Sequence, residues 1–243
     1  MLGRVSRRRF FGILAGMGAV AVGIVSFSTF EMRRQEGGEP IGGEVVKLFE
    51  PVKKGGFSVE EAIAGRRSRR AYTNEPISLK HISQLCWAAQ GITEPSTGLR
   101  AAPSAGALYP LDLFLVVGNS DLAAGVYHYS CKEHILERVK SGDYRKQLRE
   151  AALGQEWVEN GALNFVITAT YDRTTATYGQ RGRERYVPME AGHAAENICL
   201  QGESLGFGAV TVGAFNDEQV REVISGPSEH VPLYVIPVGQ IKR

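Results

Sequence analysis

Two runs of apolar residues constrain the fold more than any other feature of this sequence. They lie at 111–119 (LDLFLVVGN) and at 162–171 (ALNFVITATY). Short, nearly continuous apolar runs are typical of strands buried inside a sheet, whereas half-exposed strands alternate apolar and polar residues. We therefore expect both segments to be buried strands, with 111–119 at the centre of the sheet and 125–130 (GVYHYS) pairing beside it.

Helical patterns occur on both sides of these runs. The segment 77–91 (ISLKHISQLCWAAQG) has apolar residues about one turn apart, a cap at Ser78 and a glycine at its end. In the segment 58–65 (SVEEAIAG), Ser58 and Glu61 have the spacing of a capping box. The longest helix candidate spans 188–206. Helices and strands mix without a regular alternation, so the predicted class is α+β.

The N-terminus differs in kind from the rest of the chain. A basic cluster (SRRRFFG, 6–12) leads into a stretch from Phe10 to Phe30 with 21 residues and no charge. Such a pattern is typical of an export signal or a membrane anchor, with Arg7 and Arg8 as a twin-arginine pair. The apolar run continues past a small-residue cleavage pattern at 19–21, which favours an anchor; a cleaved signal and a buried helix are the alternatives.

The residues between this leader and the globular part are rich in glycine and in mixed charges. We therefore predict a leader at 1–30, a linker at 31–56 and a single domain at 57–243.

Charge and metal-ligand patterns exclude some functions. The net charge is +2, and residues 1–40 hold six arginines against three glutamates, so the rest of the chain has a charge of −1. A near-neutral domain argues against a nucleic-acid partner. The three cysteines are widely spaced without a CxxC pair, and the histidines form no HxxxH pair. No metal site is therefore expected.

Residues 66–72 (RRSRRAY) place four arginines in five positions. A solvated surface run and a phosphate site both fit this pattern, because the planar guanidinium group pairs bidentately with phosphate. Two further segments could complete a ligand site. The first, 102–110 (APSAGALYP), has small residues that let backbone approach a flat ligand. The second, 178–197, is expected to pass from a loop into a helix near Glu190, where free N–H groups would stabilise negative charge.

Together, RRSRRAY, APSAGALYPLDLFLVV and RYVPMEAGHAAENICLQGESLGFGAVTVGAF resemble the corresponding segments of the nitroreductase-like flavoproteins, and of the SagB-type oxidoreductases in particular. The resemblance runs from about Phe57 to Gly239. It implies a mostly antiparallel central sheet flanked by helices. It also implies a homodimer that binds FMN at each subunit interface.

The resemblance assigns the following residues to FMN. Those implied to hold the phosphate and ribityl chain are Arg66, Arg67, Ser68, Arg70, Lys242 and Arg243. Those implied to line the flavin ring are Pro103, Ser104, Ala105, Gly106, Ala191, Gly192 and Gly213, with the backbone N–H groups of Ala191 and Gly192 facing the reactive nitrogen and carbonyl. Arg69 falls at the variable position of the motif and is expected to point at solvent.

One departure from the subgroup concerns proton transfer. Azoline oxidases of the SagB type carry a Lys-Tyr pair where this chain has Thr177-Tyr178. Threonine has no basicity at neutral pH, so it cannot take a proton as lysine can. Tyr178 and His193 are then the side chains expected to deliver protons.

The resemblance and the leader predict an exported or membrane-tethered, FMN-dependent oxidoreductase. Its substrate would be a small molecule or an electron carrier. The alternative is a flavin-binding module at the membrane that transfers electrons or assists a partner without its own turnover, which the missing lysine suggests.

Overall fold

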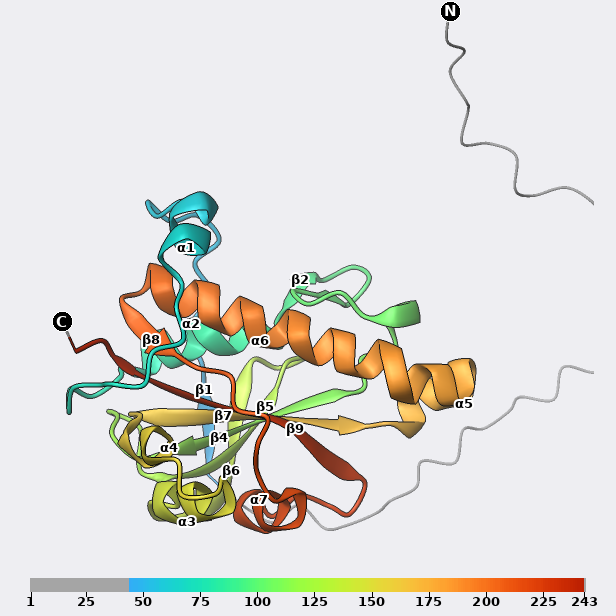
Figure 1. Cartoon of the computed structure of the whole chain (residues 1–243). Helices are drawn as coiled ribbons and strands as arrows, with labels where there is room; N and C mark the ends of the chain where they lie inside the picture. Colours follow the sequence, from blue (N-terminus) through green and yellow to red (C-terminus); the bar gives the residue numbers. More distant parts are fainter. Residues whose placement is uncertain (1–43, 243) are drawn as a thin grey trace, which may run out of the picture. The chain divides into compact units, whose positions relative to one another are not determined.

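The computed structural model describes residues 44–242, which form a seven-stranded sheet in the order β1-β6-β5-β4-β7-β9-β8 (Figure 1). Every pair of neighbours in it is antiparallel. The strands are β1 (Val45–Lys47), β4 (Leu111–Val117), β5 (Gly125–Ser130), β6 (Ile135–Ser141), β7 (Leu163–Thr170), β8 (Phe207–Ala209) and β9 (His230–Gln240). A separate hairpin joins β2 (Ile92–Glu94) and β3 (Leu99–Arg100).

The two apolar runs of the sequence form the paired strands β4 and β7 at the middle of this sheet, as predicted. Their side chains are buried on both faces, and Leu115 and Phe165, which face each other across the pair, are fully buried. The strand at 125–130 is β5, and it pairs with β4 as expected. The α+β class and the antiparallel sheet are therefore confirmed.

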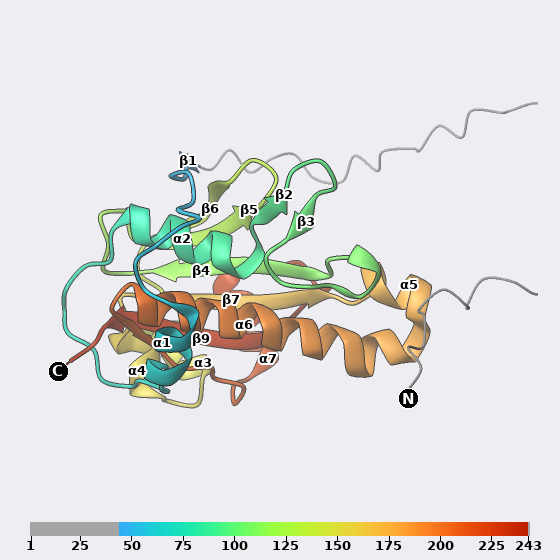
Figure 2. The same cartoon turned by 90° about the horizontal axis from the view of Figure 1, so that it is seen from above.

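Helices cover both faces of the sheet. In Figures 1 and 2, α2 and α6 lie on one face, whereas α3, α4 and α7 lie on the other. The first group packs on a core that includes Leu113, and the second on a core that includes Val116. The helices are α1 (Val59–Gly65), α2 (Leu79–Gln90), α3 (Arg145–Ala151), α4 (Glu156–Asn160), α5 (Asp172–Arg181), α6 (Val187–Ser204) and α7 (Asp217–Ile224).

The predicted helix starts at 58 and 78 are confirmed. The Ser58 hydroxyl accepts from the Glu61 N–H at 3.1 Å, and the Glu61 carboxylate accepts from the Ser58 N–H at 2.7 Å. This reciprocal pair is a complete capping box. Ser78 caps α2 through the N–H of His81.

The prediction of a loop before the long helix is wrong. A π-helical turn (Gly182–Tyr186) joins α5 to α6, and Tyr186 itself has helical dihedral angles. Pro188 explains the wider turn, because a proline ring collides with the carbonyl four residues earlier in a regular α-helix. Residues 190–193 therefore lie inside a helix and not at its free end.

The boundary predicted between linker and domain is also wrong. Residues 45–47 form β1, which pairs with β6, and Leu48 is only 4% exposed. Val52 exchanges two hydrogen bonds with the Gln84 side chain, at 2.8 and 3.0 Å. The domain thus includes residues from 44 onward. A three-residue strand is too short to show a period in the sequence.

The predicted leader lies outside the described residues. Within 44–242, no helix is both long and apolar enough to cross a bilayer.

Leu48→Ala should lower the free energy of unfolding by about 2–3 kcal/mol, because it leaves a cavity beside the core. Val45→Ala is the matched control: Val45 is 60% exposed, and its loss should cost about 0.5 kcal/mol or less. Urea unfolding of the two variants measures both values. Equal effects would contradict the assignment of residues before Phe57 to the domain.

Candidate functional site

The arginine-rich segment lies at the end of the sheet, where it runs beside β8 and then beside the residue that follows β9. Ser68 bridges Ala209 of β8, and the Arg69 N–H donates to the Ala209 carbonyl at 2.9 Å. Farther along, Tyr72 bridges Ile241, which follows β9. Backbone contacts therefore hold the segment at two points, against β8 and against the residue after β9.

Two glycines allow this close approach. A Cβ atom at Gly208 would lie 2.6 Å from the Cβ of Arg69, and one at Gly239 would lie 2.8 Å from Cγ of Tyr72. Contacts this short are not found between real Cβ atoms and their neighbours, so a larger residue at either position would push the segment away.

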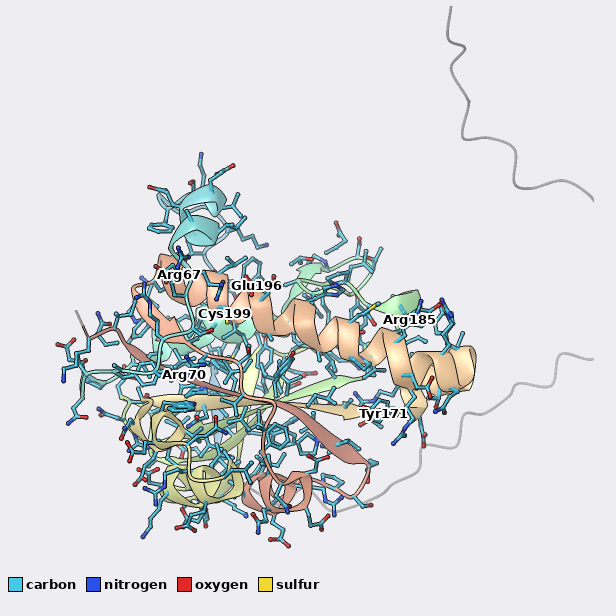
Figure 3. All side chains as sticks on the ribbon, in the orientation of Figure 1. Arg67, Arg70, Tyr171, Arg185, Glu196 and Cys199 are labelled. Carbon is cyan, nitrogen blue, oxygen red and sulfur yellow. The ribbon has the colours of Figure 1, made fainter. Side chains whose placement is uncertain are left out.

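The predicted phosphate-binding side chains reach only a few protein partners. Arg66 lies 3.5 Å from the Glu196 carboxylate of α6, and Arg67 donates to the carbonyls of Ala64 and Arg66. The Arg70 guanidinium lies 5.3 Å from the centre of the Trp157 ring. Figure 3 shows Arg67 and Glu196 toward the C-terminal end of α6, with Arg70 at the same end of the molecule.

The C-terminus joins this basic cluster. The Lys242 N–H donates to the Ala71 carbonyl at 3.4 Å, so the last strand brings Lys242 beside the arginine-rich segment. Arg243 lies outside the described residues. Guanidinium, hydroxyl and ammonium groups from two distant parts of the described chain thus lie on neighbouring backbone segments at this end of the sheet. Donors of this kind fit a phosphate group.

The expectation for Arg69 is wrong. Its side chain is half buried, and its Nε is buried without a hydrogen-bond partner. In the extended segment neighbouring side chains point to opposite sides, so Arg69 turns toward Gly208 and β8. The residue belongs to the packing of this segment.

The small-residue loop meets α5 at the opposite end of α6. The Ser104 hydroxyl accepts from the Tyr109 N–H at 2.9 Å. Gly106 has a φ of +64°, and a Cβ there would lie 2.8 Å from the Tyr178 hydroxyl. The fold therefore brings Tyr178 against the loop at 103–106, so these two parts of the predicted site lie together. Tyr178 also stacks edge-on against Tyr186, with ring centres 5.1 Å apart.

Glu190 is a site residue to which the sequence analysis gave no role. It is 3% exposed, and its Oε1 has no hydrogen-bond partner. Burial raises the pKa of this carboxyl to about 7, although the Ser104 hydroxyl and the Arg100 guanidinium act in the opposite direction. A carboxyl that titrates near neutral pH can hold or release a proton under working conditions. In the sequence, its position among small residues (PMEAGHAA) could have indicated that Glu190 is buried.

Two more of the predicted site residues lie on α6. Ala191 and Gly192 lie in the second turn of α6, where α-helical N–H groups bond to carbonyls four residues earlier. The predicted contact of these N–H groups with the flavin stays a prediction. A Cβ at Gly192 would meet no atom within 4 Å, so the helix surface is open there.

His193 is exposed and lies one turn from both Glu190 and Glu196. Gly213 is also exposed, just after the bridge between Val212 and Val235. Pro103 and Ala105 flank Ser104 in the loop, and Ser104 lies beside Glu190. No group of three or more His, Cys, Asp or Glu side chains in the described part of the chain could hold a metal ion.

Comparisons with known proteins agree with this architecture, a seven-stranded antiparallel sheet with helices on both faces. A family model described as the Nitroreductase family matches residues 63–240. The chain therefore belongs to the nitroreductase family, whose members are oxidoreductases.

Three similar proteins support this assignment. A protein named as a nitroreductase in Methanocaldococcus jannaschii is 39% identical over 188 residues, covering 76% of this chain and 91% of its own length. A solved structure described as a nitroreductase from Ralstonia eutropha has a TM-score of 0.74 at 29% identity, covering 84% of this chain and 92% of that one. An FMN reductase of Bacillus subtilis is more distant, at 22% identity over 74% of this chain and 65% of its own length.

Glu190→Gln should change how stability depends on pH. The folded-state pKa of about 7 lies above the ordinary value of 4.5, so protonated Glu190 stabilises the fold fully below about pH 4.5. That contribution, on the order of 3 kcal/mol, is lost as pH rises to about 7. Urea unfolding from pH 4.5 to 8 should show that wild-type stability falls relative to that of the glutamine variant, and Glu203→Gln serves as a control. Parallel curves would contradict the raised pKa.

Proposed function

We propose that this protein is an FMN-dependent oxidoreductase that acts as a homodimer. The observation that carries the proposal is the basic cluster of Arg66, Arg67, Arg70 and Lys242, which backbone pairing fixes at the end of the sheet beside Ser68. This donor set suits the phosphate of FMN. The bound flavin would supply the hydride or electron chemistry, and the protein would orient it and adjust its electrostatics.

The ring of the flavin would lie along α6, toward the loop at 103–106. Two observations support this placement. Gly192 leaves the helix surface open, and at Gly106 the loop lies directly against the Tyr178 ring. Glu190, buried beside Ser104, would hold a proton close to the reacting atoms, and Tyr178 and His193 would exchange protons with solvent.

Within the family, we assign the chain to the SagB-type subgroup on the segment APSAGALYPLDLFLVV. Thr177 is exposed on α5 beside Tyr178, where azoline oxidases carry their lysine. We therefore do not assign azoline oxidation by a lysine base. The same observation supports the second candidate, a flavin-binding electron-transfer or accessory module. Purified protein that holds FMN yet oxidises no NAD(P)H with any acceptor would favour that candidate.

The double variant Arg66→Ala/Arg70→Ala should weaken FMN binding by about tenfold for each guanidinium removed, because each makes a charge-assisted contact with the phosphate. Riboflavin, which lacks the phosphate, should bind the variant and the wild type alike. Quenching of flavin fluorescence measures both affinities, and Arg221→Ala on α7 is the matched control.

Two results would overturn different parts of the proposal. A wild-type protein that takes up no flavin would reject the function itself. Unchanged FMN affinity in the double variant would reject only the phosphate assignment.

For the N-terminal segment, we propose export by the twin-arginine route with retention at the membrane. Cell fractionation should recover the full-length protein with membranes, and Arg7→Lys/Arg8→Lys should prevent its export, because that route requires the arginine pair. Recovery of the wild type wholly in the cytosol would reject both export and tethering. An exported enzyme would need an electron donor other than cytoplasmic NAD(P)H.

A further inference from the structure

A cavity apart from the basic cluster lies where β4 begins and β5 ends. Its volume is about 260 Å³, and the polar residues that line it are Gln90, Arg100, Asp112, His128, Ser130 and Lys132. Pockets for drug-sized ligands usually occupy about 300–1,000 Å³, so this one suits only a small molecule. None of the residues assigned to FMN lines it.

The Arg100 guanidinium has unused donors. Its NH1 donates to the Gln90 Oε1 at 3.1 Å, and the group lies 4.4 Å from the centre of the Tyr109 ring. Among residues 44–242 no carboxylate lies within ion-pair distance of it, since Arg100 takes part in none of the ion pairs found there. Arginine can present two parallel N–H groups to a carboxylate, and here that fork is free.

Gln90 adds a second unused donor. The residue is 3% exposed, and its Nε2 is buried without a hydrogen-bond partner. The orientation of the amide follows from Arg100, which can only donate and so must face the oxygen. A buried donor left unpaired costs about 1–3 kcal/mol. Gln90 lines the cavity, so a ligand acceptor that reached its Nε2 would remove that cost.

The charges around the cavity favour an anion. Lys132 adds a positive charge at the surface, and two carboxylates raise the pKa of His128 despite its burial. Those carboxylates are Asp112, at 3.8 Å from the ring, and Glu137, at 3.5 Å.

Asp112 is the one acidic group in the lining. It already pairs with Arg173 at 3.0 Å and lies 3.5 Å from His230. Its charge is therefore largely compensated, and the cationic groups dominate the cavity.

We propose that this cavity binds a small carboxylate. One carboxylate group would accept two hydrogen bonds from the Arg100 fork and one from the Gln90 amide, with Lys132 and His128 stabilising the remaining charge. The site goes beyond the proposed flavin chemistry. Because Arg100 also acts on the Glu190 carboxyl, a bound anion would change the electrostatics at one end of the flavin site.

Calorimetric titration of the full-length, FMN-saturated protein with succinate at fixed ionic strength tests this site. Saturating FMN keeps the basic cluster at 66–70 occupied, so that it does not compete for the anion. We expect one saturable site per chain, and no binding of the uncharged analogue succinamide.

Three variants locate the site. Arg100→Met should weaken succinate binding by about 100-fold, and Gln90→Leu by about tenfold, in line with a charged and a neutral hydrogen bond in a desolvated site. Lys146→Ala, which removes an exposed charge on α3, should change nothing. The His128 ring signals in NMR provide a second readout, since a bound anion should raise the pKa of that ring. We expect this rise with succinate in the wild type and in Lys146→Ala, but not in Arg100→Met or Gln90→Leu.

Absence of saturable binding in the wild type would overturn the proposal. Equal affinity in Gln90→Leu and Lys146→Ala would overturn it as well, and this comparison remains valid if Arg100→Met fails to fold. Loss of FMN uptake in the wild type would reject the flavin function, yet succinate binding to the FMN-free protein could still be measured.

Discussion

The structure depends on the pairing of β4 with β7. Seven residue pairs, from Leu111 with Ala169 to Val117 with Leu163, join two strands that are buried on both faces. Apolar side chains on both faces can be covered only if helices lie above and below the sheet. That requirement places α6 on one face, and with it every side chain that the site draws from 187–204.

The site is completed by segments that are distant in the sequence. Residues 66–72 pack against the end of the β8–β9 pair because Gly208 and Gly239 leave room for Arg69 and Tyr72. The same hydrogen bonds bring Lys242 beside Ala71. Backbone pairing thus brings Lys242 beside the arginine-rich segment, and the proposed phosphate site depends on this arrangement.

Along α6 the electrostatic environment changes from one end to the other. Near Glu196 the helix contacts Arg66 of the basic cluster, whereas near Glu190 it meets the loop at 103–106, and burial raises the pKa of the Glu190 carboxyl to about 7. A flavin oriented along this helix would have its charged end at the cations and its reacting ring near a proton donor. Arg100 acts on the Glu190 carboxyl and also lines the cavity where β4 begins and β5 ends.

The sequence by itself determined the elements with a strong local signal: the buried strands at 111–119 and 162–171, the capped helices at 59 and 79, and the motif segments that place the chain in its family. Tertiary structure alone decided that β1 belongs to the sheet, that Arg69 packs inward, that α5 runs into α6, and that Glu190 and Gln90 are buried. The reason is physical. Periodicity and capping depend on neighbours within a few residues, whereas burial, a shifted pKa and an unpaired donor depend on chains that meet only after folding.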